Sequence, residues 1–399
     1  MSEGEVPTIG STTARRLQGI PPTIFAEMSA LAVATGAVNL GQGFPDVDGP
    51  AEIIKEAVAA LESGRNQYAP GPGVPALREA VAAHQRRHYG LAFDPAREVA
   101  VTTGATEGIA AAILALVDPG DEVILVEPYY DSYPAMVQFA GGVRRPVTLS
   151  LDASAPGGRL PREALEAAVS AKTKLLMLNT PHNPTGTVLT RDELETVAAF
   201  ARDHDLTVVS DEVYEHLTFD AMAHIPIATL DGMRERTLTL SSIGKSFSFT
   251  GWKVGWATGP ERLVQALLAA KQWMTFTSGA PLQPAAAYAL DHLDGWPKEL
   301  AHDLQGRRDL LCAGLREIGL DVTIPEGTYF AVSDVEELGW ADSLEFCRAL
   351  PERAGVVAVP LQGFYDTDAG KHLVRWTFTK QRDVIEEALE RLSNGRLAR

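Results

Sequence analysis

From residue 99 onward, short apolar runs alternate with segments that have the periodicity of amphipathic helices. We expect a buried strand at each of five apolar runs: VAVTTG, DEVILVEP, TKLLMLNTP, LTVVSDEVY and RTLTLSS. Helical patterns such as RDELETVAAFARDHD separate some of these runs. Near-continuous apolar strands that alternate with helices are typical of a mostly parallel sheet with helices on both faces. The pattern therefore predicts an α/β fold with such a sheet at its centre.

The chain before residue 99 has helical patterns and loops in place of strands. Three segments have apolar residues at helical spacing and end at a glycine: TIFAEMSALAVATG, AEIIKEAVAALESG and ALREAVAAHQRRHYG. Glycine commonly follows the last turn of a helix, because it adopts a left-handed conformation without strain. GQGFPDVDGP and NQYAPGPGVP are too rich in Gly and Pro for regular structure, so we expect loops there.

After Pro281 the chain is rich in helical patterns, interrupted by three strand-like runs: LDVTIPEGTYFAVSD, VVAVPLQGF and HLVRWTFTK. We interpret this section as a smaller α+β domain that the N-terminal segment completes. The predicted organisation is an arm and helix at residues 1–45 that join the small domain, a large domain at 46–284, and the small C-terminal domain at 285–399. A length of 399 residues, 45% of them hydrophobic, agrees with two domains.

Charge and cysteine content exclude several classes of protein. A formal net charge of −17 repels phosphate backbones and anionic membranes, so we expect no nucleic-acid or membrane partner. Cys312 and Cys347 are the only cysteines, without a CxxC or Cys/His cluster, so we expect neither a disulfide framework nor a metal site. The N-terminus MSEGEVPTIG lacks the apolar run of a signal peptide, and we expect a cytoplasmic protein.

Polar and Gly-rich residues follow each of the five predicted strands. In open α/β sheets, ligands collect beyond the carboxyl ends of the strands. The segments at these ends are GATEG, EPYYDSY, NTPHNPTG, SDEVY and SSIGK. Turn chemistry accounts for any one of them, but five together indicate a ligand-binding crevice.

Two lysines in SSIGKSFSFTGWKVGW indicate the kind of ligand. Lys245, beside Gly244 and small hydroxyl residues, suits a side chain that bonds covalently to an aldehyde, since a reactive lysine must be desolvated or conjugated. Lys253, with Ser242, suits a phosphate. Together they favour a phosphorylated aldehyde cofactor, and the alternative is a pair of surface lysines beside a turn.

Asp211 follows the apolar LTVVS, and its carboxylate should lie at the strand end near the crevice. A buried carboxylate must be paired or neutralised. A lysine or a helix N-terminus would serve, and so would a pyridinium nitrogen, which the carboxylate would keep protonated. Tyr214 is a candidate to reach the ring's phenolate oxygen, or is a core tyrosine.

Two further strand ends carry candidate cofactor ligands. The amides of Asn179 and Asn183, in NTPHNPTG, could donate to the same ring oxygen, or form only an Asn-Pro turn. Gly104 opens a helix, so that the backbone N–H groups of Ala105 and Thr106 and the Thr106 hydroxyl could bind a phosphate. Helix capping by Thr106 is the alternative there.

Tyr130 and Arg375 are the remaining candidates from the pattern alone. Tyr130, in EPYYDSY, is a candidate face for stacking on an aromatic ring. In HLVRWTF, alternation places Arg375 on the strand face opposite Trp376. The arginine would form a structural ion pair, or would bind the α-carboxylate of an amino acid through its planar guanidinium.

Taken together, these residues resemble the class I aminotransferases that depend on pyridoxal 5′-phosphate (PLP) and have fold type I. Six motifs occur in the family's order: GQGFPD, YAPGPG, NTPHNPTG, SDEVYEHL, SIGKSFSFTGWKVGW and HLVRWTF. Within the family, the chain looks like the branch of kynurenine, glutamine-phenylpyruvate and methionine aminotransferases, and especially like N-succinyldiaminopimelate aminotransferases. The resemblance implies a large PLP-binding domain with a mostly parallel sheet, and a smaller α+β domain.

The resemblance also assigns cofactor contacts. It implies that Lys245 bonds the PLP aldehyde and then moves the proton at the substrate's α-carbon. Asp211 pairs the pyridine nitrogen, Asn183 and Tyr214 bind the ring oxygen, and Tyr130 stacks on the ring.

For the substrate and the assembly, the resemblance implies that Arg375 binds the carboxylate and that Gly43 lines the substrate pocket. It also implies a homodimer, in which Tyr68 reaches the phosphate in the neighbouring subunit. Much of the wider class has arginine where Lys253 stands, so phosphate binding here lacks a bidentate partner.

We therefore expect an aminotransferase that passes an amino group from an L-amino acid to a 2-oxo acid by a ping-pong mechanism. Two alternatives remain at this point: a PLP-dependent lyase that eliminates from cysteine conjugates, and a PLP-binding regulator without catalysis. Fold analogy alone does not choose among the amino acids.

Overall fold

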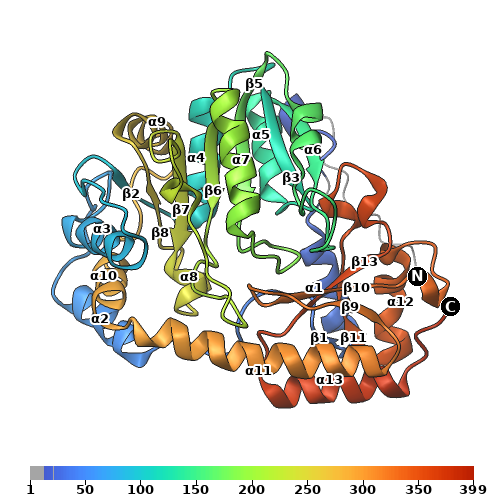
Figure 1. Ribbon diagram of the computed structural model, residues 1–399. Helices are drawn as coiled ribbons and strands as arrows, with labels where there is room; N and C mark the ends of the chain where they lie inside the picture. The colour runs from blue at the N-terminus through green and yellow to red at the C-terminus, as the bar shows by residue number, and fades with distance from the viewer. Residues whose placement is uncertain (1–12, 21) are drawn as a thin grey trace.

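The computed structural model describes residues 13–20 and 22–399, and residues 1–12 and 21 lie outside the described part (Figure 1). Residues 1–12 and 21 of the predicted arm and helix at 1–45 therefore fall outside the described residues. No helix in the described part of the chain is long and apolar enough to cross a membrane.

A seven-stranded sheet lies at the centre of the larger part of the molecule, with its strands in the order β2-β8-β7-β6-β5-β3-β4. Every neighbouring pair is parallel except those of β8, which runs antiparallel to β2 and β7. The strands are β2 (Val99–Thr102), β3 (Glu122–Glu127), β4 (Val143–Thr148), β5 (Thr173–Asn179), β6 (Thr207–Asp211), β7 (Thr237–Ser242) and β8 (Gly255–Thr258). The predicted mostly parallel sheet is confirmed.

Two strands of this sheet were not predicted, each for a local reason. β4 lies at the sheet edge, and most of its residues are exposed or partly exposed, so VRRPVT lacks an apolar run. β8 is only four residues long, GWAT, and it leaves the Gly-rich bend directly.

Helices cover both faces of the sheet (Figure 1). Along β3, Val123 and Leu125 pack with residues of α4, α5 and α9, while Ile124 and Val126 pack with residues of α6 and α7. Alternate side chains of a strand point to opposite faces, so a continuous apolar run is what such a strand requires. The helices are α4 (Gly104–Leu116), α5 (Ser132–Ala140), α6 (Arg162–Ala168), α7 (Arg191–Asp203) and α9 (Glu261–Lys271).

A smaller antiparallel sheet, in the order β12-β13-β10-β9, forms a second layered unit near the C-terminus. Its strands are β9 (Asp321–Thr323), β10 (Phe330–Asp334), β12 (Val359–Pro360) and β13 (Leu373–Thr377), and its helices are α11 (Gly295–Glu317), α12 (Ser343–Ala354) and α13 (Arg382–Asn394). The N-terminal α1 (Ile24–Thr35) packs against α12, and β1 (Val38–Asn39) pairs in parallel with β11 (Val356–Val357). The domain boundaries at residues 45 and 284 remain predictions.

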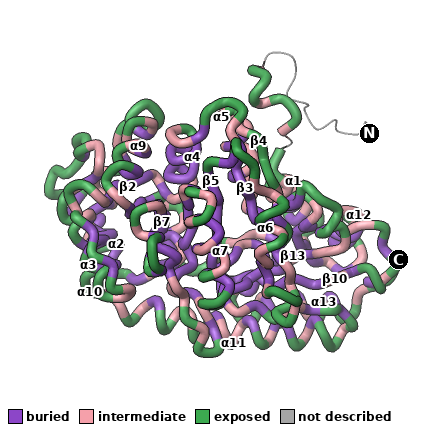
Figure 2. The backbone as a smooth tube through the Cα atoms, turned by 45° about the horizontal axis from the view of Figure 1, so that its top comes forward, coloured by how far each residue is buried: buried purple, intermediate pink, exposed green. Residues whose placement is uncertain are grey.

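The remaining elements flank the two sheets. Helices α2 (Ala51–Glu62), α3 (Pro75–Tyr89) and α10 (Leu282–His292) pack together beside β2. A one-turn helix, α8 (Ile243–Ser246), follows β7 directly. The 3₁₀ turns are η1 (Arg15–Leu17), η2 (Ile227–Thr229), η3 (Thr250–Trp252), η4 (Glu336–Leu338), η5 (Gln362–Phe364) and η6 (Asp368–Gly370). Buried residues run through both sheets, and exposed residues follow the outer sides of the helices (Figure 2).

Candidate active site

The carboxyl ends of the parallel strands surround a pocket of about 140 Å³. Strand register creates it, because Asn179 at the end of β5 pairs with Asp211 at the end of β6. The structure brings eleven predicted residues to this pocket: Gly104, Ala105, Thr106, Tyr130, Asn179, Asn183, Asp211, Tyr214, Ser242, Lys245 and Lys253.

Lys245 presents its amine to this pocket from the single turn of α8. Lys245 Nζ donates a hydrogen bond to the Tyr329 hydroxyl at 2.8 Å, and that hydroxyl donates to the Gly43 carbonyl at 2.7 Å. A Cβ atom on Gly43 would lie 2.4 Å from Phe330 Cζ, so only glycine fits there. Gly43 is thus one hydrogen-bonding residue away from Lys245, although it does not line the pocket itself.

Tyr329 was not identified from the sequence. It lies just before β10, and 84 positions separate it from Lys245. The one local signal is Thr328, which has a φ of 65° and marks a constrained turn before the strand. Such a turn does not indicate that the next side chain, Tyr329, contacts Lys245.

The N-terminus of α4 meets Lys253 at one end of the pocket. Gly104 has a φ of 71°, and a Cβ there would lie 3.2 Å from Lys253 Nζ, so the lysine amine reaches the start of the helix. Thr103, which precedes α4, makes no side-chain cap hydrogen bond. The N–H groups of the first turn, including those of Ala105 and Thr106, are therefore open to a ligand.

A second glycine keeps this corner open. A Cβ on Gly255 would lie 2.8 Å from the carbonyl carbon of Gly104 and 2.9 Å from the nitrogen of Ala105. With Ser242 in the same pocket, the corner has the donors and the positive charge that a phosphate group requires.

Asp211 is buried, and its carboxylate accepts hydrogen bonds from the Tyr133 hydroxyl at 2.7 Å and the Val213 N–H at 3.3 Å. Burial raises its pKa from 3.8 to about 6, against the opposing effect of the Tyr133 hydrogen bond. No ion pair to Asp211 exists among the described residues. A buried carboxylate without a cation fits the protonated nitrogen of a pyridine ring.

Tyr133 is the second residue that sequence reasoning missed. It is the second residue of α5, three positions after Tyr130, and 78 positions separate it from Asp211. The motif EPYYDSY contains three tyrosines, and nothing in their spacing tells which one reaches the carboxylate.

The two asparagines have different surroundings. The Asn179 amide nitrogen donates to the Asp211 carbonyl at 2.7 Å, and Asn179 Oδ1 accepts from the Asn183 N–H at 2.8 Å. Asn183 Oδ1 accepts from Arg375 Nη1 at 3.1 Å, and its NH₂ group has no protein partner within the described chain. Asn179 therefore positions Asp211 and Asn183, while Asn183 has a donor group left for a ligand. Tyr214, fully buried, lies with its ring centroid 5.5 Å from Lys245 Nζ.

Arg375, on β13, is 2% exposed and reaches the same region. Its Nη2 donates to the Gly41 carbonyl at 2.9 Å, its Nε is buried without a partner, and Phe330 lies 4.0 Å from the guanidinium carbon. Burial lowers the Arg375 pKa to about 10. In the described residues it makes no ion pair, so the structural alternative is not supported. A buried cation without a carboxylate favours an anionic ligand.

Tyr68 does not reach this pocket. Its side chain is 82% exposed, and its ring lies edge-on to Phe276 with centroids 5.4 Å apart. The other predicted residues fit PLP by their chemistry: an amine for the aldehyde, a buried carboxylate for the ring nitrogen, and an open helix N-terminus with a lysine for the phosphate.

Comparisons with known proteins agree with this chemistry. The family described as aminotransferase class I and II matches residues 35–392. A relative named probable N-succinyldiaminopimelate aminotransferase, from Mycobacterium tuberculosis, is 52% identical over 96% of this chain and 98% of the relative. Kynurenine–oxoglutarate transaminase 3 from Mus musculus is 38% identical over 94% of this chain and 89% of the relative. A solved structure of N-succinyldiaminopimelate aminotransferase from Mycobacterium tuberculosis superposes with a TM-score of 0.93 at 52% identity, covering 96% of this chain and 99% of that one.

Proposed function

This chain belongs to the class I and II aminotransferases, which are PLP-dependent enzymes of fold type I, and on that premise we propose roles for its pocket residues and a substrate class. The enzyme moves an amino group between an amino acid and a 2-oxo acid. When bound, PLP supplies the aldehyde that captures the amino group and a ring that accepts the electrons left on the α-carbon. Membership of this family favours an enzyme over a non-catalytic regulator.

In our proposal, the pocket residues divide the work of binding the cofactor. Lys253, Ser242 and the first turn of α4 hold the phosphate, because they combine positive charge with open N–H donors. Asp211, fixed by Tyr133, keeps a proton on the ring nitrogen. Supported by their places around the pocket, the Asn183 amide and the Tyr214 side chain bind the ring oxygen, and Tyr130 stacks on the ring.

Lys245 and Arg375 act on the substrate in this proposal. Lys245 Nζ, held by the Tyr329 hydroxyl at 2.8 Å, moves the proton at the substrate's α-carbon. Arg375 binds the α-carboxylate, and this supplies the counter-charge that its buried guanidinium lacks. The observation that carries the proposal is the combination of this unpaired cation with a lysine amine at one crevice.

The proposed amino donor is an N-succinyldiaminopimelate-type amino acid, with kynurenine as the runner-up. The support is similarity: 52% identity to the mycobacterial relative over 96% of this chain, against 38% to the murine kynurenine transaminase. The side-chain pocket does not by itself choose between them.

A half-reaction panel tests both the activity and the donor. Holoenzyme is mixed with N-succinyl-L,L-diaminopimelate, kynurenine, methionine or glutamine, and the loss of the cofactor's aldehyde absorbance is followed in a stopped-flow instrument. We expect the first donor to react at least about tenfold faster than the others, and Lys245→Ala not to convert the cofactor to its aminated form with any donor. A faster reaction with kynurenine would reassign the substrate.

Cysteine conjugates provide a further arm of the panel. Transamination requires a 2-oxo acid acceptor for turnover, whereas β-elimination releases pyruvate without one. Pyruvate release from a cysteine conjugate in the absence of acceptor, at a rate above that of transamination, would make the lyase alternative the main activity.

We further propose that a second copy of the chain covers an exposed apolar patch. The patch consists of Tyr68, Trp273, Met274 and Phe276, which are 82%, 84%, 43% and 53% exposed. Lys271 holds its loop, because Nζ donates to the Phe276 carbonyl at 3.1 Å. Clustered exposed aromatic side chains mark interaction surfaces, and a symmetric dimer would bring Tyr68 to the partner's cofactor.

The oligomer is tested by Trp273→Asp, with Val33→Asp as the matched control because Val33 is also exposed, at 87%, but lies on α1. We expect sedimentation to show dimeric wild type and control, and a monomeric Trp273→Asp that binds PLP more weakly. A dimeric Trp273→Asp variant would place the interface elsewhere.

We also propose a cytoplasmic location, supported by two free, buried cysteines.

A further inference from the structure

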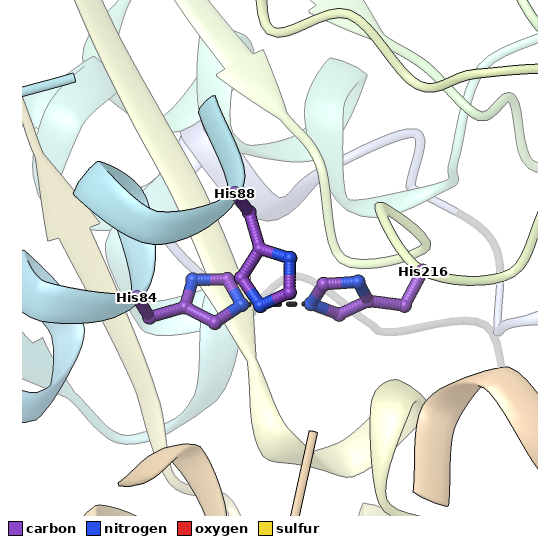
Figure 3. A group of neighbouring side chains, drawn as sticks. All are labelled: His84, His88 and His216. Carbon is purple, nitrogen blue, oxygen red and sulfur yellow. Dashed lines mark hydrogen bonds between the residues drawn. The ribbon is translucent and has the colours of Figure 1, made fainter. Parts of the chain in front are cut away.

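Three histidines converge at a position outside the cofactor pocket (Figure 3). His84 and His88 come from one face of α3, four positions apart, and His216 comes from the segment after β6. One ring nitrogen of each lies within 4.8 Å of the others. The sequence predicted no metal site, because the third histidine is 128 residues away from the HxxxH pair and no cysteine accompanies them.

The distances between the rings are close to those of a metal site. His84 Nε2 and His216 Nε2 are 2.7 Å apart, so one ring donates a hydrogen bond to the other. Around a tetrahedral Zn²⁺ with Zn–N bonds of about 2.0–2.1 Å, ligand nitrogens lie about 3.3 Å apart. The His84–His216 separation of 2.7 Å is shorter than that value, and all three ligand nitrogens lie within 4.8 Å of one another. His88 and His216 are only partly buried, so their rings are less constrained by packing than that of His84.

The polar contacts of His84 are all directed into this cluster. The residue is 2% exposed, and its Nδ1 is buried without a partner in the described structure. The only hydrogen bond of the ring is therefore the one to His216. A bound metal ion would replace the shared proton, which moves to Nδ1 of the same ring, and both Nε2 atoms would become ligands.

The surrounding charges favour a cation. Glu215 is buried at 4% exposure and accepts hydrogen bonds from the Tyr89 hydroxyl at 2.7 Å and the Ser241 hydroxyl at 2.5 Å. Asp294 Oδ1 lies 3.4 Å from His88 Nε2, and the same carboxylate pairs with Arg87 at 2.7 Å. Two carboxylates against one guanidinium leave a local excess of one negative charge, which attracts a divalent ion.

We propose that His84, His88 and His216 form a binding site for a divalent transition metal of the Zn²⁺ type, with water in the fourth position. Imidazole nitrogen suits Zn²⁺, and three histidines with one open position are a common zinc geometry. His216 follows Tyr214 by two residues and Asp211 by five, so the metal would tie α3 to the segment that carries two residues of the cofactor pocket. The site is independent of the amino donor.

The test uses PLP-saturated holoenzyme that has been stripped of metals with a chelator and titrated with ZnCl₂ against a chromogenic competitor. Wild type is compared with His88→Ala, which changes a partly exposed ring, and with His216→Ala. His302→Ala is the matched control, because His302 is an exposed histidine on α11. Thermal unfolding with and without Zn²⁺ provides the second readout.

We expect one Zn²⁺ ion per chain in wild type and in the control, and a dissociation constant at least about tenfold higher in both cluster variants, as for loss of a direct ligand. Zn²⁺ should raise the melting temperature of wild type and control but not that of His88→Ala. Equal Zn²⁺ affinity in His88→Ala and wild type would overturn the proposal, and so would a wild type that takes up no ion at micromolar Zn²⁺.

Discussion

Asp211→Asn should stabilise the cofactor-free enzyme at neutral pH, although it removes a residue that we assign to the cofactor. Burial raises the pKa of Asp211 from 3.8 to about 6, so the native state holds its proton more tightly than the unfolded chain does. Native stability therefore falls as pH rises from about 3.8 to about 6 and stays reduced above that. At about 1.4 kcal/mol for each pH unit, the loss is up to about 3 kcal/mol. An amide does not ionise and avoids this loss.

Urea unfolding of PLP-free wild type and Asp211→Asn, at a fixed protein concentration, measures the difference between pH 4 and pH 8. Groups other than Asp211 titrate in both proteins, so their effects cancel in the difference. We expect the variant to be more stable at pH 8 by up to about 3 kcal/mol, and the advantage to shrink toward zero near pH 4. Asp321→Asn, at an exposed strand position, is the matched control.

With PLP present, wild type should be more stable than Asp211→Asn. A protonated ring nitrogen gives the Asp211 carboxylate its missing counter-charge, so PLP should stabilise wild type far more than the variant. The reasoning would be refuted if PLP-free Asp211→Asn were no more stable than wild type at pH 8. A difference that did not change between pH 4 and pH 8 would also refute it, because the effect would then not come from ionisation.

Three further substitutions test the assigned roles. Arg375→Lys should lower kcat/KM in steady-state transamination by about 100-fold, mainly through KM, because a single ammonium loses the bidentate hydrogen bonds to a carboxylate. Lys253→Ala should raise the PLP dissociation constant at least about tenfold, measured by equilibrium dialysis, since it removes the charge beside the open end of α4. Tyr329→Phe should lower the stopped-flow half-reaction rate by about tenfold with little change in PLP affinity, because it removes the hydroxyl that bonds Lys245 Nζ at 2.8 Å.

Each of these has a clear contrary result. An unchanged KM in Arg375→Lys would mean that another group binds the carboxylate. If Lys253→Ala bound PLP with wild-type affinity, the N-terminus of α4 would bind the phosphate without help from Lys253. A Tyr329→Phe variant with full half-reaction rate would show that the Lys245 amine needs no positioning by this hydroxyl.

The strand ends were predictable because one regularity governs them. A parallel sheet that is buried on both faces requires continuous apolar runs, and its ligands lie beyond the carboxyl ends of its strands. The residues after TKLLML and LTVVS could therefore be placed near each other from the sequence alone. The pairing of Asn179 with Asp211 in adjacent strands is the direct consequence.

The contacts that hold the site could not be predicted in the same way. Tyr133, Tyr329 and His216 act through partners 78, 84 and 132 positions away in the chain. Which hydroxyl or ring reaches a given atom depends on the packing of helices and loops against the sheet, and periodicity contains no information about that. Asn179 illustrates the limit: its type and position were identified, but its amide is used to position Asp211 and Asn183.

The site contains buried groups of both charge signs whose nearest opposite charges, Lys245 for Asp211 and Asp131 for Arg375, make no ion pair with them in the described residues. Asp211 and Arg375 are 4% and 2% exposed, yet neither makes an ion pair among the described residues. Burial shifts both pKa values toward the neutral forms, which means that both groups cost folding free energy in the absence of a ligand. A chain selected for stability alone would pair or remove such groups. Because a ring nitrogen and an α-carboxylate each supply one missing charge, the free energy lost on folding is regained on binding, and the pocket favours ligands that carry both.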